Sequence, residues 1–152
     1  KFDVAHGTKG GMLLHKGDFK AAIQSFDKAI ALKPDYLRAI YGRGICKAFL
    51  KDYKGSISDF TKVIALDKNY SQAYYNRAIS NAILKNHKEA IPDYDMAINA
   101  DPKNPEIYYN RGISKMNVQD NNGGCEDFRK ALELGYQPAE QMINIYCPKT
   151  NN

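Results

Sequence analysis

The stretch AYYNRAIS (Ala73 to Ser80) decides the fold, because it returns almost unchanged as IYYNRGIS (Ile107 to Ser114). A looser copy, AIYGRGIC, lies earlier at Ala39 to Cys46, and the step from the first copy to the second equals the step from the second to the third. A fixed period of about 34 residues, kept without insertion or deletion, indicates a chain built from repeated structural units.

Rows of this length, starting at Asp3, align columns of similar residues. The aromatic column holds Phe26, Phe60, Tyr94 and Phe128. Small residues fill two other columns, at Ala22, Ser56, Ala90 and Gly124 and at Gly10, Gly44, Ala78 and Gly112. Apolar residues within a row recur at spacings of three and four, as on one face of a helix. Each row is therefore predicted to be a hairpin of two helices, which the small residues allow to pack closely.

The segment AYYNRAISNAILKNHKEAIPDYDMAINADP (Ala73 to Pro102) resembles the tetratricopeptide repeat along its whole length. It has the early Tyr, the Ala four residues later, the Ala–aromatic–Ala series and the closing Pro of that family. The resemblance implies an all-α, right-handed superhelical solenoid of antiparallel helix hairpins. The expected parts are four repeats at residues 3–36, 37–70, 71–104 and 105–138, a capping helix at residues 139–147 and a flexible tail at residues 148–152.

The same resemblance implies a groove, because the first helix of each repeat lines the concave side in this family. Tyrosines and isoleucines would form two ladders there, and asparagines would contact the backbone of a bound peptide. The groove residues expected in this way are Arg38, Tyr41, Ile45, Phe49, Tyr75, Asn76, Ile79, Tyr109, Asn110 and Ile113. The first tyrosine of each pair, Tyr74 or Tyr108, is expected in the core. The alternative is that the ladder tyrosines only pack together and the asparagines satisfy local backbone groups.

An arginine column and an aspartate column occur in the same three rows. Antiparallel hairpins bring the two columns close together, which predicts partly buried structural ion pairs. The expected pairs are Arg43 with Asp59, Arg77 with Asp93 and Arg111 with Asp127. Three arginines that grip an acidic ligand are the alternative.

Cys125 starts the second helix of the last repeat and Cys147 ends the capping helix, so the two could form a disulfide. Two buried thiols are the alternative. A disulfide would indicate a periplasmic or exported protein, and free thiols a cytoplasmic one. The sequence leaves localisation open at this point, including an export signal upstream of Lys1. The Tyr-Cys end of the cap, after a Leu-Glu-Leu-Gly turn, resembles bacterial family members.

Composition and motifs limit the classes of function that the sequence indicates. The chain has 152 residues and a formal charge of +5, but its lysines are scattered singly, as on a solvated surface. No apolar run is long enough to span a membrane. The sequence lacks metal-ligand, nucleophile and phosphate-loop motifs, so no enzyme, cofactor or metal is expected. The lysine and asparagine set that binds chaperone tails in some family members is matched here by Asn76 alone.

These observations predict a protein–protein interaction module, a scaffold or adaptor that binds a peptide or protein segment in the Tyr/Ile groove. Self-association into a homo-oligomer is the first alternative. An RNA-binding helical repeat is the second, and it would need a path of Lys and Arg that the nearly uncharged groove columns lack.

Overall fold

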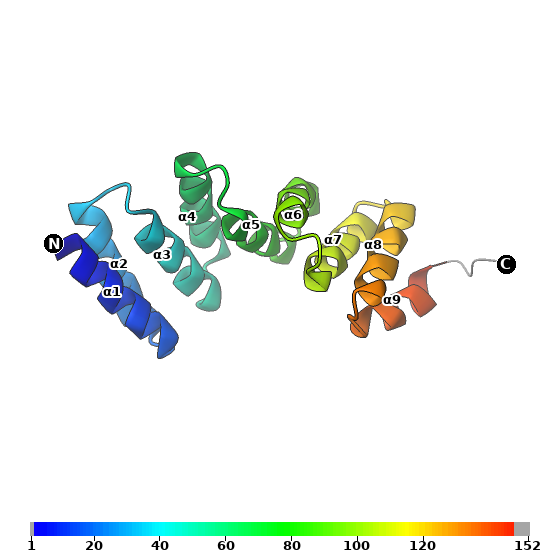
Figure 1. The fold of residues 1–152 in the computed structure, drawn as a ribbon, viewed down its shortest axis with the longest axis horizontal. Helices are drawn as coiled ribbons and strands as arrows, with labels where there is room; N and C mark the ends of the chain where they lie inside the picture. The colour runs from blue at the N-terminus through cyan, green and yellow to red at the C-terminus, as the bar shows by residue number, and fades with distance from the viewer. Residues whose placement is uncertain (1, 148–152) are drawn as a thin grey trace. The chain divides into compact units, whose positions relative to one another are not determined.

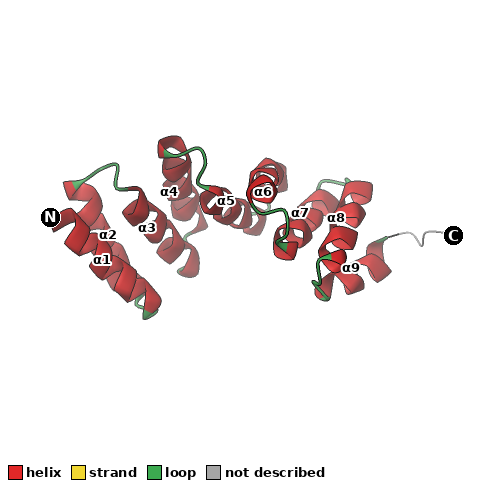
Figure 2. Cartoon of the chain, viewed as in Figure 1, coloured by secondary structure: helices red, strands yellow, loops and turns green. Residues whose placement is uncertain are grey.

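The computed structural model describes residues 2–147, which are helical apart from short turns (Figures 1 and 2). The helices are α1 (Phe2–His15), α2 (Phe19–Leu32), α3 (Leu37–Phe49), α4 (Tyr53–Leu66), α5 (Ser71–Ile83), α6 (His87–Ala100), α7 (Pro105–Asn117), α8 (Asn121–Glu133) and α9 (Pro138–Tyr146). The predicted all-α class is confirmed. The expected tail at residues 148–152 lies outside the described residues.

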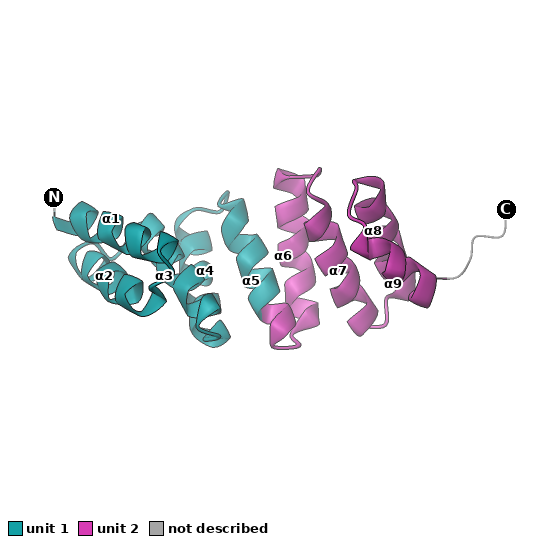
Figure 3. Ribbon diagram, turned by 90° about the horizontal axis from the view of Figure 1, so that it is seen from below, with its two compact units in different colours: residues 1–80 teal, residues 81–152 magenta. Residues whose placement is uncertain are grey.

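The chain divides into two compact units, residues 1–80 and 81–152 (Figure 3). Unit 1 holds α1 to α4 and most of α5, and unit 2 holds α6 to α9. In unit 1, α1 packs against α2 and α3, and α3 also packs against α2 and α4. In unit 2, each of α6, α7 and α8 packs against the helix that follows it. Each unit is thus a stack of helices joined by short turns.

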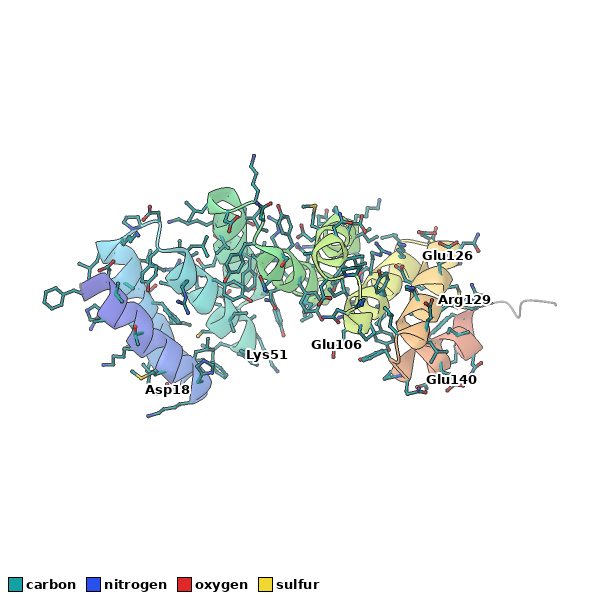
Figure 4. All side chains as sticks on the ribbon, in the orientation of Figure 1. Asp18, Lys51, Glu106, Glu126, Arg129 and Glu140 are labelled. Carbon is teal, nitrogen blue, oxygen red and sulfur yellow. A yellow bond between two sulfur atoms is a disulfide. The ribbon has the colours of Figure 1, made fainter. Side chains whose placement is uncertain are left out.

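Aspartates begin the second helix of three hairpins. Asp18, Asp52 and Asp120 accept hydrogen bonds from the backbone N–H groups of Ala21, Gly55 and Gly123, at 3.1, 3.0 and 3.0 Å. These bonds satisfy donors that the first turn of a helix leaves unpaired. Asp18 lies at the turn between α1 and α2, and Lys51 at the turn between α3 and α4 (Figure 4).

The residue just before each cap adopts a left-handed conformation. This residue is Gly17 in the first hairpin, with φ of 78°, but Lys51, Lys85 and Gln119 in the next three, with φ of 65°, 64° and 68°. A side chain in this region carries a steric cost that glycine does not. Three turns are therefore held in a conformation that their own residues disfavour.

Replacement of Lys51 by glycine is expected to raise the free energy of unfolding by about 0.5–1 kcal/mol, because glycine adopts this φ without the steric cost. Chemical denaturation followed by circular dichroism measures the change. Lys62→Gly is the control: it removes an exposed lysine from the middle of α4 and is expected to destabilise by about 1 kcal/mol. A loss of stability in Lys51→Gly would contradict the interpretation.

The small and aromatic columns form the core of each unit. Phe60 and Phe128 are fully buried, each against a glycine of the preceding helix, Gly44 or Gly112. A Cβ atom on either glycine would lie 2.8 Å from the Cε1 atom of the facing ring, closer than van der Waals contact allows. The glycines therefore let the first helix of a hairpin approach the aromatic ring of the second.

Candidate functional site

In unit 1, Tyr41 contacts two aromatic rings and Asn76, another of the predicted groove residues. Its ring centroid is 5.8 Å from that of Phe60 and 5.0 Å from that of Tyr70. The Asn76 Nδ2 atom donates to Tyr41 Oη and to the Gln72 carbonyl oxygen, both at 2.9 Å. The two amide hydrogens of Asn76 are thus used locally, which leaves its Oδ1 acceptor as the atom that could meet the N–H of a ligand.

Tyr41 keeps its proton at neutral pH. Burial raises the pKa of its phenol to about 12, assisted by the neighbouring Tyr70 and opposed by the hydrogen bond from Asn76. Because Tyr41 Oη accepts from Asn76, its own hydrogen remains a donor for a ligand. Tyr41 and Arg38 line a pocket of about 560 Å³ that lies within unit 1.

Tyr109 occupies the equivalent place in unit 2. Its ring centroid is 5.7 Å from that of Phe128 and 5.0 Å from that of Tyr136. Tyr109 and Ile113 line a second pocket, of about 410 Å³. The remaining lining residues are Met116, Asn117, Met142 and Tyr146. The capping helix α9 therefore supplies part of an apolar site around the predicted groove residues.

Five of the other predicted groove residues do not line either pocket. Ile45, Tyr75, Ile79 and Asn110 are half-exposed. Phe49 is 64% exposed and stacks on Phe19, with ring centroids 4.6 Å apart and an interplanar angle of 3°. Phe49 is not a lining residue of the unit 1 pocket.

Neither Tyr74 nor Tyr108, which were expected in the core, is fully buried, although Tyr108 packs against the core of unit 2. Both side chains are half-exposed. Each ring lies below the guanidinium of the arginine three residues later, Arg77 or Arg111, at 5.7 Å, a distance typical of cation–π contact. Tyr108 Oη also donates to the Pro102 carbonyl oxygen at 3.1 Å. The first tyrosine of each pair therefore lies under an arginine guanidinium, and Tyr108 contacts the core of unit 2 as well.

Arg43 connects two carboxylates in unit 1. Its Nε and Nη2 atoms donate to the two carboxylate oxygens of Asp59 at 2.9 and 2.5 Å, and its Nη1 donates to Asp27 Oδ1 at 2.6 Å. Lys47 Nζ lies 2.8 Å from the same Asp59, which is buried. The hydrogen bond with Asp59 raises the pKa of Arg43 further above its usual range, against the effect of burial. Two cations thus satisfy one buried carboxylate.

The same set recurs in unit 2, two repeats further along the chain. Arg111 donates to both oxygens of Asp127 at 2.8 and 2.6 Å and to Asp95 Oδ1 at 2.6 Å, and Lys115 Nζ lies 3.0 Å from Asp127. Burial opposes the charge of Arg111, but Asp127 and Asp95 outweigh it and raise the pKa. The donors of Arg43 and Arg111 are therefore directed at carboxylates of the protein itself.

The third repeat differs from this arrangement. Arg77 Nη1 donates to Thr61 Oγ1 at 3.1 Å, where the other sets have an aspartate. Asp93 is buried and belongs to unit 2, so its pairing with Arg77 stays a prediction.

The cysteines are distributed as one pair and one single thiol. Cys125, at the start of α8, and Cys147, after the end of α9, form a disulfide with their Cα atoms 5.6 Å apart. Cys46 is buried and free, and burial raises its pKa to about 11. A thiol with such a pKa stays protonated at neutral pH and reacts poorly.

Several residues of these sites were not predicted from the sequence. Asp27, Lys47, Asp95 and Lys115 complete the ion-pair sets, and their signal is a recurrence in every second repeat rather than in every repeat. Tyr70 and Tyr136 flank the ladder tyrosines from the turns between repeats. Among the described residues there is no cluster of His, Cys, Asp and Glu that could hold a metal ion. Within residues 2–147, no helix has both the length and the apolar character that crossing a bilayer requires.

Two models of known protein families match parts of this sequence. The family model described as tetratricopeptide repeat matches residues 5–36, and a second, described as TPR repeat, matches residues 83–117. No curated protein matches the chain.

Solved structures agree with the fold. The crystal structure of MamA protein has a TM-score of 0.90 at 21% identity and covers 95% of this chain and 80% of its own. MamA 41-end from Desulfovibrio magneticus RS-1 has a TM-score of 0.86 at 20% identity, over 95% of this chain and 92% of its own. The first TPR of Spaghetti (RPAP3), bound to the HSP90 peptide SRMEEVD, has a TM-score of 0.74 at 22% identity, over 78% of this chain and 94% of its own.

The two matched segments lie one near the start of the chain and one in its second half, and they carry the columns that recur in the rows between them. Repeats of this family are in general non-enzymatic modules of protein–protein interaction. The helix hairpins, their fixed period and both matches lead to one assignment: residues 5–36 and 83–117 of this chain match tetratricopeptide repeats.

Proposed function

We propose that this protein is a protein–protein interaction module that binds a peptide or protein segment through the tyrosines and isoleucines in the first helix of its repeats, as a scaffold or adaptor. The observation that carries the proposal is that Tyr41 in unit 1 and Tyr109 in unit 2 each line a pocket, of mixed polar and apolar character in unit 1 and mainly apolar in unit 2. Tyrosine offers a rigid apolar ring and a polar tip, which suits peptide recognition. No catalytic role is proposed.

The likeness to a tetratricopeptide domain whose structure holds a peptide supports this reading. That peptide, SRMEEVD, is acidic, whereas the chaperone-binding set of lysines and asparagines is largely missing from this sequence. We therefore infer a different peptide class. The disulfide between Cys125 and Cys147 supports a protein that works in an oxidising compartment, periplasmic or exported.

A random-peptide phage library tests the proposal. Ile45→Glu combined with Ile113→Glu places one charge on the proposed face of each unit. This variant is expected to lose at least about tenfold in affinity for the selected peptides, because each isoleucine contributes apolar area to the interface. Affinities are measured by isothermal calorimetry on the peptides selected by the wild type.

The control variant combines Leu66→Glu with Met96→Glu. It also adds one charge to each unit, at side chains that are 44% and 43% exposed on α4 and α6. It is expected to bind as the wild type does. Equal loss in both variants, or no selected peptide at all, would contradict the proposal. Concentration-dependent self-association that only Ile45→Glu with Ile113→Glu disrupts would instead assign the face to a homo-oligomer.

A further inference from the structure

The unit 1 pocket lies where the first repeat departs from the others. Later repeats place a tyrosine and an isoleucine at two neighbouring columns, as in Tyr41 and Ile45, but the first repeat has Gly7 and Gly11 there. Both glycines line the 560 Å³ pocket. The pocket thus coincides with two missing side chains of the apolar ladder.

The two glycines contribute differently. A Cβ on Gly7 would lie 2.7 Å from Tyr36 Cε1, so the Tyr36 ring already takes the space beside it. A Cβ on Gly11 would meet no atom within 4 Å. The space opened at Gly11 is therefore available to a side chain from another molecule.

The walls of the pocket favour an apolar group with a negative neighbour. Val4, Met12, Leu14 and Phe26 supply apolar surface. Tyr41 offers the hydroxyl donor described above, and Arg38 is an exposed cation on the rim. No Asp or Glu is among the lining residues.

Arg38 acts electrostatically on this pocket. Burial raises the pKa of Tyr70, and the positive charge of Arg38 works against that rise, whereas Asp67, which does not line the pocket, adds to it. Arg38 is therefore close enough to affect a charge that enters beside Tyr70.

We propose that this pocket receives a phenylalanine-sized apolar side chain of a bound peptide in the space left open at Gly11, while Arg38 pairs with an adjacent aspartate of that peptide. This inference rests on the proposed function and names the peptide class: an aromatic residue next to a carboxylate. The aromatic ring would pack among the tyrosine rings and the apolar walls, and its acidic neighbour would lie at the exposed rim.

The test uses the acetylated, amidated tetrapeptide Gly-Phe-Asp-Gly as probe, titrated into the full chain and followed by the backbone amide signals in NMR spectra. Gly-Ala-Asp-Gly is expected to bind at least about tenfold more weakly, because it lacks the ring. Gly-Phe-Asn-Gly is expected to bind about threefold more weakly, because the ion pair at the rim is exposed.

Variants of the protein assign the site. Gly11→Ile fills the open space with the residue that later repeats have there, and it is expected to abolish binding without lowering the melting temperature. Ala5→Ile adds the same side chain at an exposed position of α1 that does not line the pocket, and it is expected to bind as the wild type does. Arg38→Gln should weaken Gly-Phe-Asp-Gly to the level of Gly-Phe-Asn-Gly and leave the latter unchanged.

Two results would overturn the inference: undiminished binding by Gly11→Ile, or the same affinity for all three tetrapeptides. If Gly11→Ile does not fold, the comparison of the tetrapeptides with Arg38→Gln tests the inference on its own. Arg38 is exposed, so its replacement is expected to leave the fold intact. A further result would contradict this inference while leaving the proposed function intact. Library peptides lost by Ile45→Glu with Ile113→Glu but retained by Gly11→Ile would keep a binding face and exclude this pocket from it.

Discussion

Replacement of Asp127 by alanine is expected to lower the free energy of unfolding by about 3–5 kcal/mol, the cost of breaking a buried ion pair on one side. Asp127 is buried and accepts from Arg111 and Lys115, whose side chains are 16% and 18% exposed. Without the carboxylate, two largely buried cations lose their main partner. Urea denaturation followed by circular dichroism measures the loss, and hydrogen exchange locates it in unit 2.

Asp95→Ala is the matched control. Asp95 contacts the same Arg111 at 2.6 Å, but its side chain is 50% exposed, so its removal is expected to cost less than about 1 kcal/mol. Unit 1 repeats the comparison independently with Asp59→Ala and Asp27→Ala. Equal effects of the buried and the exposed aspartate would show that burial does not set the strength of these pairs.

Reduction of the disulfide is expected to destabilise unit 2 by about 3 kcal/mol. The bond between Cys125 and Cys147 closes a loop with a sequence separation of 22, and this is the loop-closure contribution expected for that length. The helix that it fastens, α9, has 9 residues, fewer than an isolated helix needs to form in water. After reduction, the packing of Ala139, Met142 and Ile143 against the core remains to hold it.

The measurement is the melting temperature with and without dithiothreitol. The wild type is expected to melt lower when reduced, and Cys125→Ser combined with Cys147→Ser should melt at that lower temperature under both conditions. The double variant keeps Cys46, so any effect of dithiothreitol on its melting temperature would come from this thiol and not from the disulfide. An unchanged wild-type melting temperature on reduction would mean that packing alone holds α9 in place.

The fold could be predicted from the sequence because its period and its apolar spacing are both regular. The capping helix illustrates this: residues 139–147 were expected, and α9 runs from Pro138–Tyr146. The disulfide also joins two elements whose antiparallel contact follows from the order of the helices.

The site was less predictable, because columns show which face a residue occupies but not where a long side chain goes. Tyr74 and Tyr108 occupy a column that was assigned to the core, yet both are only half-buried and each lies under an arginine. The Phe49 ring stacks on that of Phe19, which belongs to a different column. The unit 1 pocket depends on Gly7 and Gly11, where the ladder pattern is absent, so the columns alone do not indicate it.

The spacing of the ion-pair sets determines which gains or losses of repeats keep the charges paired. Asp27, Arg43, Lys47 and Asp59 recur as Asp95, Arg111, Lys115 and Asp127, so equivalent charges are separated by two whole repeats. Excision of residues 45–112 would join Gly44 to Ile113 and bring Arg43 into register with Lys115 and Asp127. Recombination in steps of two repeats therefore preserves a complete set of charges, whereas a step of one repeat mixes it with the Arg77 row, which has Thr61 and Asn81 in these columns.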